Sequence, residues 1–476
     1  MKKVVIFLII AVIPLLMFSR ENKFIEDYLW VKKTIEENDA GFDYAIQQKG
    51  IEAYNQHNEN ILKQIKQIDN MTEFKKLLNK WLHFFRPGHI GIYPVNIGEP
   101  DSKSKEPQPI EQYADWEKIE FQLSEFRDYL VKDKKDNIEG IWDLSSYKIG
   151  IIKQENEYLG FIIEAENKFW KKGQIKLRIP LTKDKMTYYM GNHSERNFDE
   201  LEIIDNAFIQ SSFITLRKDF PKTKTNELLT DYFKSINAKS PYLKRLNENI
   251  LVLRIPSFLY TEKSKIDSIL AANKEKFTQT KNLIIDLRNN GGGSDRSFKE
   301  IIPLIYTNPI RTIGVEYLST PLNNRRMEEF TPNSEAEKKW AQQALEKLNN
   351  NIGKFVNIND KKVSITKLDT IYDYPQNVGI IINEHNGSTT EQFLLAAKQS
   401  KKVKLFGVTT SGILDISNMY FVNSPDNDFK LAYCLSKSLR IPEMTIDNKG
   451  IQPDYYLDKS IPQYKWIEFV DRILKQ

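Results

Sequence analysis

Residues Val378–Gln399 read VGIIINEHNGSTTEQFLLAAKQ. The run Val378–Ile382 is apolar and rich in β-branched residues, which is typical of a strand buried on both faces of a sheet. A polar turn, Asn383–Gly387, follows it, and the apolar spacing over Phe393–Ala397 then predicts a helix. Ser388 therefore lies at a strand-to-helix junction, where a hydroxyl can be held at the edge of a sheet near a helix N-terminus.

The sequence around Ser388 allows two interpretations. Residues 388–391, Ser-Thr-Thr-Glu, form a capping box, in which Ser388 and Glu391 satisfy backbone donors at the start of a helix. On this interpretation Ser388 is structural. On the other, Ser388 is a nucleophile, which requires a base and an oxyanion-binding loop from elsewhere in the chain.

A second loop, NLIIDLRNNGGG at Asn282–Gly293, repeats the pattern. Leu283–Asp286 predicts a buried strand that ends in two asparagines and three glycines, and Ser297–Tyr306 predicts a helix. If the two strands are parallel in one sheet, both loops open at its carboxyl edge, where α/β sheets bind ligands. Backbone N–H groups of the glycine loop could then face the Ser388 hydroxyl. The loop has neither a P-loop lysine nor GxGxxG spacing, which disfavours nucleotide binding.

Four motifs together resemble those of a known family. They are IIDLRNNGGG (284–293), NEHNGSTTE (383–391), GVTTSG (407–412) and DNKGIQPD (447–454). In this order they are similar to the tail-specific serine peptidases, which comprise the carboxyl-terminal processing proteases, the tricorn core and the interphotoreceptor retinoid-binding proteins. The resemblance implies a ClpP/crotonase-like mixed β/α core and hydrolysis of peptide bonds in polypeptides.

Length and patterning predict four segments within the 476 residues. These are a leader (1–21), an N-terminal helical region (22–98), a linker with a short helix and a β-rich module (99–235), and an α/β core (236–476). Forty per cent hydrophobic and 12% aromatic residues indicate a folded protein. The net charge of +5 comes from 69 basic and 64 acidic residues that are interspersed, so no nucleic-acid partner is expected.

The N-terminal segment predicts export. Lys2 and Lys3 precede the apolar run Val4–Phe18, as in a secretory signal. As a helix this run would cover roughly 22 Å of the ~30 Å hydrocarbon core. The residues after it do not form a small-x-small cleavage site, so both a cleaved signal and a retained membrane anchor stay open. Cys434 is the single cysteine, in an apolar stretch that predicts burial, and no metal or cofactor motif is present.

The β-rich segment lies between about residues 138 and 220 and predicts an antiparallel meander or small barrel. A linker rich in Pro, Lys, Ser and Glu, Glu99–Gln112, precedes it. The family often carries a PDZ module near this place, and YLGF (158–161) is similar to the PDZ carboxylate-binding loop. The glycine-bearing continuation of such modules is missing, which favours a lipocalin-like or other β module.

Five histidines are candidates for a general base. His57 and His193 lie in polar stretches and are expected to be solvated, His83 lies within a predicted helix, and His385 could line the mouth of a site at Ser388. His89 follows Pro87–Gly88, after apolar-periodic helices. The segment PGHIGI (87–92) resembles the family's Gly-His motif, which in tricorn-like members carries the general base.

The family has two ways to activate its serine. Carboxyl-terminal processing proteases use a lysine in the segment that aligns with residues 407–414, where this chain has none; Lys404, Lys430 and Lys437 lie outside that motif. Tricorn-like members use a histidine and an acid, and DNKGIQPD places Asp447 where that acid lies. The resemblance therefore implies a triad of Ser388, His89 and Asp447, with the N–H groups of Thr389 and Gly292 as the oxyanion hole.

Three function classes remain after the sequence analysis. The first is an exported serine endopeptidase that acts on polypeptides without a cofactor or metal. The second is a ligand-binding protein on the same fold, because the retinoid-binding relatives use this architecture without peptidase activity. The third is an esterase with the same residues, which the absence of a GxSxG motif disfavours.

Overall fold

The computed structural model describes the chain except for residues 1–22, 96–115, 133–134, 168, 192 and 333. The predicted leader and the predicted linker Glu99–Gln112 therefore lie outside the described residues. Within the described ranges, every helix is too short or too polar to span a lipid bilayer.

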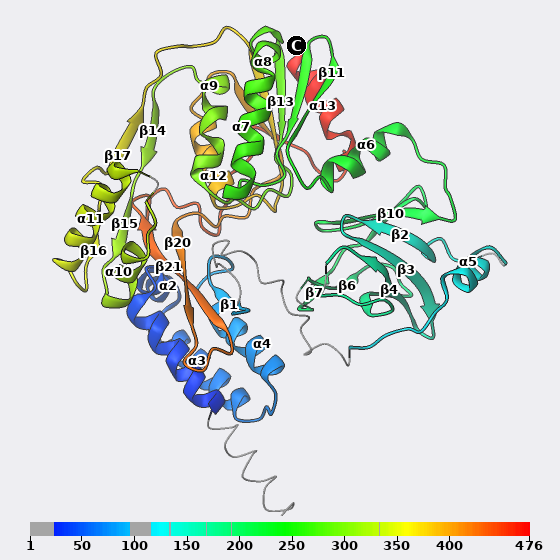
Figure 1. Cartoon of the computed structure of the whole chain (residues 1–476), viewed down its shortest axis with the longest axis horizontal. Coiled ribbons are helices and arrows are strands. Elements are labelled where there is room, and N and C mark those ends of the chain that lie inside the picture. The colour runs from blue at the N-terminus through cyan, green and yellow to red at the C-terminus, as the bar shows by residue number, and fades with distance from the viewer. Residues whose placement is uncertain (1–22, 96–115, 133–134, 168, 192, 333) are drawn as a thin grey trace, which may run out of the picture.

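A six-stranded sheet forms the centre of the second half of the chain (Figure 1). Its order is β11-β12-β13-β18-β19-β22; β11 is antiparallel to β12, and the others are parallel. The strands are β11 (Tyr242–Asn247), β12 (Ile250–Arg254), β13 (Asn282–Asp286), β18 (Asn377–Ile382), β19 (Val403–Gly407) and β22 (Tyr455–Tyr456). Asp286 pairs with Ile381, so the glycine loop and the Ser388 loop leave the sheet at the same edge, as predicted.

Alternate residues of the central strands pack on opposite faces, as the two-residue period of a strand requires. Leu283 and Ile285 of β13 pack under one helical layer, and Ile284 packs with Trp466 and Val470 on the other side. The first layer contains η2 (Tyr260–Glu262), α7 (Lys263–Ala272), α8 (Lys274–Gln279), η3 (Asp295–Ile301), α9 (Ile302–Ile305) and α12 (Thr389–Ala397). The opposite face carries η4 (Gln463–Lys465) and α13 (Trp466–Leu474) (Figure 1).

The N-terminal helices pack on a second sheet, far away in sequence. They are residues 23–38, α2 (Phe42–Lys49), α3 (Ile51–Ile65) and α4 (Met71–Leu82). Their apolar stripe forms one cluster with β20 (Ile416–Asn423) and β21 (Lys430–Ser438). After α4, β1 (Gly91–Tyr93) pairs antiparallel with β21, with Gly91 opposite Ala432. This pairing places the His89 segment beside the late strands.

The β module is a nine-stranded antiparallel sheet in the order β7-β6-β5-β4-β3-β2-β10-β9-β8. The strands are β2 (Gly140–Leu144), β3 (Tyr147–Gln154), β4 (Glu157–Ala165), β5 (Ile175–Pro180), β6 (Met186–Tyr189), β7 (Glu195–Phe198), β8 (Glu202–Ile204), β9 (Phe208–Ser211) and β10 (Ile214–Phe220), after α5 (Leu123–Lys132). It packs against the core through α6 (Glu227–Ile236), whose Leu229 and Phe233 contact Phe208 of β9.

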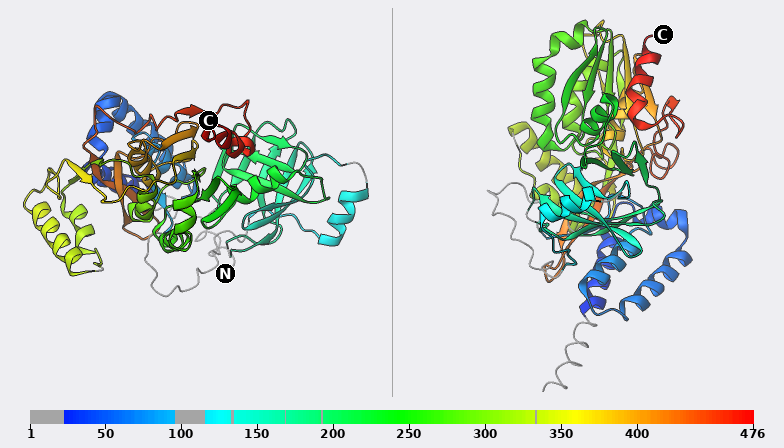
Figure 2. Two further views of the ribbon diagram at one scale, coloured as in Figure 1. Left: turned by 90° about the horizontal axis from the view of Figure 1, so that it is seen from above. Right: turned by 90° about the vertical axis from the view of Figure 1, so that its right-hand side faces the viewer.

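A smaller lobe lies on the side of the core away from the β module (Figures 1 and 2). It contains β14 (Ile310–Ile313), β15 (Val315–Leu318), α10 (Pro321–Glu328), α11 (Glu335–Asn349), β16 (Phe355–Val356) and β17 (Val363–Thr366). β15 joins the second sheet, whose order is β1-β21-β15-β16 with β20 beside β21. The β20–β21 pair therefore links this lobe to the N-terminal helices.

Candidate active site

Ser388 has a strained backbone at the start of α12. Its φ of 55° and ψ of −125° lie outside the regions that a non-glycine residue commonly adopts. Such a conformation costs about 1–3 kcal/mol and is found mainly where function requires it. A strand-to-helix turn of this kind lifts a serine side chain to the edge of a sheet. The sequence around Ser388 has no GxSxG motif, so the strained backbone of this serine could not be predicted from that motif.

Glu391 ties the Ser388 loop to a neighbouring loop. Its Oε2 accepts the Ser388 N–H at 3.2 Å, which is one half of the predicted capping box. The same carboxylate accepts the N–H groups of Gly412 at 2.7 Å and Ile413 at 3.0 Å, and the Thr410 hydroxyl at 2.5 Å. Burial raises the pKa of Glu391 above its ordinary value. Glu391 therefore fixes the serine turn against residues 410–413.

Asparagine side chains join the Ser388 loop to the glycine loop. Asn383 and Asn289 bind each other reciprocally: the Asn383 Nδ2 donates to Asn289 Oδ1 at 2.7 Å, and the Asn289 N–H donates to Asn383 Oδ1 at 2.9 Å. The buried Asn386 Nδ2 donates to the carbonyls of Leu287 at 2.6 Å and Asn290 at 3.0 Å. The two loops therefore form one rigid unit at the sheet edge.

Gly292 directly contacts the serine. A Cβ placed on Gly292, whose φ is +105°, would lie 2.9 Å from both the Ser388 Cβ and the Thr389 nitrogen, so only glycine fits. The Thr389 N–H has no acceptor in the described part of the chain. The Gly292 N–H, in contrast, donates to Asn290 Oδ1 at 3.0 Å, in an Asx turn. Of the two predicted oxyanion donors, Thr389 is available and Gly292 is engaged.

His89 is held by a buried ion pair and by a late strand. Arg86 pairs with Asp39 at 2.6 and 2.7 Å and also donates to the His89 carbonyl at 3.1 Å. The Asp39 carboxylate accepts the N–H of Cys434 on β21 at 3.0 Å. The His89 Nδ1 lies 2.8 Å from the carbonyl oxygen of Ile416, 327 residues later in the chain.

The contact with Ile416 decides the tautomer of His89. A carbonyl can only accept a hydrogen bond, so Nδ1 must carry the proton, and in the neutral ring Nε2 is an acceptor. Burial lowers the pKa of His89, and the Arg86 guanidinium acts in the same direction. The imidazole is therefore neutral at neutral pH, with Nε2 ready to take a proton.

Asp447 does not hydrogen bond to His89, contrary to the arrangement that the resemblance implies. Its Oδ1 accepts the N–H groups of Leu414 and Asp415, both at 2.6 Å, and its Oδ2 accepts that of Ile416 at 3.2 Å. The orienting contact to the ring comes from the Ile416 carbonyl instead. Asp447 therefore fixes residues 414–416, and the carbonyl of Ile416 in turn orients the His89 ring. Burial raises the pKa of Asp447 to about 6, and the nearby Asp415 carboxylate also raises it.

The side chain of Ile413 packs against the residues that precede the histidine and the serine. A Cβ placed on Gly88 would lie 2.9 Å from the Ile413 side chain, and one placed on Gly387 would lie 2.6 Å from it. Each glycine directly precedes one predicted catalytic residue, so His89 and Ser388 flank one isoleucine. No hydrogen bond joins their side chains among the described residues, and unliganded sites are often looser than catalytic complexes.

His385 contacts the β module. Its Nε2 lies 3.1 Å from the Ser212 hydroxyl, and its ring meets that of Phe213 edge-to-face at 5.5 Å. Ser212 and Phe213 form the turn between β9 and β10. The module therefore reaches the polar turn that precedes Ser388, a contact between segments 173 residues apart.

Two further histidines pack on aromatic rings, and the prediction that His193 is solvated was wrong. His193 is 5% exposed and stacks on Trp170 at 3.8 Å, so it is not solvated, whereas His57 is half-buried and stacks on Phe84 at 4.9 Å. Among the three lysines outside the family's motif, Lys437 pairs with Glu316. Cys434 is buried, as predicted.

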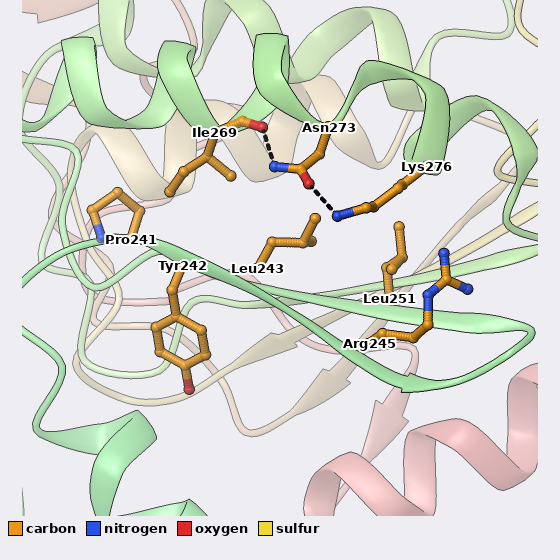
Figure 3. A pocket seen from close by; sticks show the side chains of 8 residues that line it. All are labelled: Pro241, Tyr242, Leu243, Arg245, Leu251, Ile269, Asn273 and Lys276. Carbon is orange, nitrogen blue, oxygen red and sulfur yellow. Dashed lines mark hydrogen bonds between the residues drawn. The ribbon is translucent and has the colours of Figure 1, made fainter.

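A hollow of about 270 Å³ lies outside this cluster, between the edge strand β11 and helices α7 and α8 (Figure 3). Leu243, Leu251 and Ile269 line it, with Arg245 and Lys276 at one end. The lining contains no residue of the loops at Ser388, His89 or Asp447. The hollow is thus separate from the candidate site.

The fold and these loops define a serine-hydrolase-like site on an α/β core. Residues 249–457 match the family model for peptidase family S41. The core of the chain is therefore similar to the S41 family, the tail-specific serine peptidases, as the four motifs predicted. No curated protein matches the chain in sequence.

Solved structures share the overall architecture. Mature CPAF is 11% identical, with 96% of this chain and 97% of that chain covered and a TM-score of 0.52. CPAF complexed with lactacystin is 11% identical, with 96% and 98% covered and a TM-score of 0.50. At these identities the likeness shows the fold alone. The α/β fold with N-terminal helices and antiparallel sheets is thereby confirmed.

Proposed function

We propose that this protein is an exported serine endopeptidase in which Ser388 is the nucleophile and His89 the general base. The observation that carries the proposal is the Nδ1 contact of His89 with the Ile416 carbonyl at 2.8 Å. It leaves Nε2 as a proton acceptor on a partly buried, neutral ring, and the residues that precede this ring and the strained serine both lie against Ile413. A general base needs this combination of tautomer and protonation state.

The reaction follows from these groups. The Ser388 Oγ attacks the carbonyl carbon of the scissile bond while its proton passes to His89 Nε2. The carbonyl oxygen becomes an oxyanion that the Thr389 N–H can stabilise. A second donor from the glycine loop is Gly292, once its N–H leaves Asn290. Collapse expels the amine, which takes the proton from His89, and water then hydrolyses the acyl-serine by the same steps.

Asp447 acts in this proposal as a positioning residue. By binding three consecutive N–H groups it fixes residues 414–416, and hence the Ile416 carbonyl that orients the His89 ring. The ligand-binding alternative has no need of a fixed imidazole tautomer or of a strained serine. These two features favour the enzyme.

The direct test uses internally quenched peptides and an unfolded protein as substrates. We expect the wild-type chain to cleave within them and the Ser388→Ala variant to lose activity by at least about ten-thousandfold. Ser400→Ala, three residues beyond the C-terminal end of α12, is the matched control and should keep full activity. Equal turnover by Ser388→Ala would exclude Ser388 as the nucleophile.

Export is proposed from the sequence, since the basic and apolar N-terminus resembles a secretory signal. Fractionation of cells that express the full chain, with a tag at the C-terminus, tests it. Recovery of the protein outside the cytoplasm or in the membrane is expected. Recovery only in the cytoplasm would contradict export.

A further inference from the structure

Leu259 and Tyr260 are two adjacent, exposed apolar side chains at the site edge of the core sheet. Their exposed fractions are 57% and 58%. They follow β12 and precede α7, at the carboxyl edge where the glycine loop and Ser388 also lie. Burial of two consecutive large apolar side chains that are exposed to water lowers the free energy. Binding of a partner that covers them is therefore favoured.

The segment that presents these side chains is rigid. The preceding Phe258 is fully buried, its N–H donates to the Gly292 carbonyl at 3.1 Å, and its carbonyl accepts the Ser294 N–H at 2.8 Å. The Leu259 carbonyl accepts the Ser297 hydroxyl at 3.3 Å. The two side chains are therefore held in place before any ligand arrives, which lowers the entropic cost of binding.

The segment is also close to Ser388. A Cβ placed on Gly293 would lie 2.3 Å from the Leu259 nitrogen, and Gly292, the preceding residue, contacts the Ser388 Cβ. Two glycines therefore separate Leu259 from Ser388, a span on the order of 10 Å. An extended peptide advances about 3.3 Å per residue, so its third residue from the scissile bond reaches this segment.

The charges beside the segment are neutralised internally. Glu262 pairs with Lys265 at 2.8 Å, and Lys263 pairs with Asp267. Because each of these four groups is paired, none of them is free to bind a substrate ion, and the exposed part of the segment is formed by two apolar side chains. Ligands with a carboxylate or an ammonium group at the same position would lose hydration without a compensating partner.

We propose that Leu259 and Tyr260 form a specificity subsite that binds an apolar side chain of an extended polypeptide, two or three residues from the bond that is cleaved. This inference rests on the proposed function of Ser388. Burial of one leucine or phenylalanine side chain should improve kcat/KM by about 10- to 100-fold over aspartate or lysine at that position. The effect lies mainly in KM, because the contact forms in the ground state as well as in the transition state.

The test is the double variant Leu259→Ser/Tyr260→Ser, measured on quenched peptides that carry leucine, aspartate or lysine at each of the three positions on either side of the bond. The matched control is Ile365→Ser/Ile371→Ser, which removes two apolar side chains that are 56% and 55% exposed in the other lobe and after it. We expect the first variant to lose the preference for leucine and the control to keep it. A variant that keeps the preference would overturn the inference.

A binding assay separates this inference from the proposed function. The same peptides, fluorescently labelled, are titrated into Ser388→Ala with and without the double substitution, and anisotropy gives the Kd. Leu259→Ser/Tyr260→Ser should weaken binding of the leucine peptides at least about tenfold and leave that of the lysine peptides unchanged. If the wild type cleaves nothing, the proposed function fails, and this binding result still decides the subsite. Equal Kd values for the leucine peptides would exclude it.

Discussion

The serine half and the histidine half of the candidate site are built differently. Ser388 lies on a turn between a strand and a helix; Asn386 links this turn to the glycine loop, and Glu391 links it to residues 410–413. His89 follows the N-terminal helices, and its ring is oriented by one carbonyl at the start of β20, more than three hundred residues away. The first half is thus held by local structure and the second by long-range packing.

This difference predicts where the site is fragile. The serine turn has several buried hydrogen bonds, so the loss of one changes stability more than geometry. Among the described residues, the His89 ring has one orienting contact, and that contact depends on a segment that Asp447 holds by three backbone N–H groups. Substitutions in the second half should therefore reduce catalysis with little effect on unfolding.

The largest effect is expected for His89→Ala. The variant lacks the proton acceptor, so kcat should fall by about a thousandfold to ten-thousandfold while the Tm changes little. The measurement is the steady-state rate on a quenched peptide. His57→Ala, which removes another half-buried ring from the N-terminal helices, is the control and should keep its activity. Comparable rates for the two variants would exclude His89 as the base.

Asp447→Asn should have a smaller effect, and its size separates two arrangements. In a direct triad the amide favours the wrong tautomer and costs about ten-thousandfold in kcat. Here the orienting group is the Ile416 carbonyl, and an asparagine Oδ1 can still accept a backbone N–H, so we expect a loss of about 10- to 100-fold. Asp454→Asn, another carboxylate that accepts a backbone N–H, is the control. A ten-thousandfold loss would favour the direct triad.

Acidic pH should inactivate the enzyme through two groups of the histidine half. The pKa of His89 is lowered by burial, so the ring stays neutral at neutral pH and is protonated only as the pH falls below its usual range. The pKa of Asp447 is raised to about 6, so its carboxylate is protonated as the pH falls through that value. Protonation of His89 removes activity and protonation of Asp447 lowers it about 10- to 100-fold, so where both groups titrate the rate should fall by more than about tenfold per pH unit.

The dependence of the rate on pH, measured for Asp447→Asn, shows how much of the acidic loss comes from Asp447. In this variant His89 is the group that still titrates, so at acidic pH the rate should fall about tenfold per pH unit. Equal slopes for wild type and variant would show that Asp447 does not control the site. Circular dichroism at each pH distinguishes this loss of activity from unfolding.

In the serine half, Asn386→Ala should mainly reduce stability. The substitution leaves the buried N–H of Asn383 without its acceptor and removes one of two donors from each of the carbonyls of Leu287 and Asn290. We expect the free energy of unfolding to fall by about 3 kcal/mol. Asn350→Ala, at an exposed site in the other lobe, should change it by less than about 0.5 kcal/mol. Urea unfolding measures both; equal values would show that the asparagine network is not important for stability.

The local half of the site could be predicted from the sequence. Two buried-strand patterns, each followed by a polar or glycine-rich loop, predicted parallel strands whose loops meet at one edge, and the register of Asp286 with Ile381 confirms it. Cys434 was also predicted correctly as a buried residue.

The rest of the site depends on loop conformations and long-range contacts, which the spacing of apolar residues in the sequence does not predict. His89 was found only through a resemblance, since its segment is short and its partner strand is far away in the chain. The contacts of Asp447 with three N–H groups, the Gly292 N–H that turns to Asn290 and the strained φ of Ser388 follow from loop conformations. The stacking of His193 on Trp170 likewise comes from tertiary packing of a segment that is polar in sequence.

The most direct test of the central claim is covalent labelling of Ser388 by a fluorophosphonate, followed by mass spectrometry of the labelled peptide. The reagent reacts with a serine whose proton is taken by a neighbouring base, and it needs no knowledge of the natural substrate. We predict labelling at Ser388 in the wild type and labelling at least about 100-fold slower in His89→Ala. No label on Ser388, or equal rates in the two proteins, would contradict a serine activated by His89.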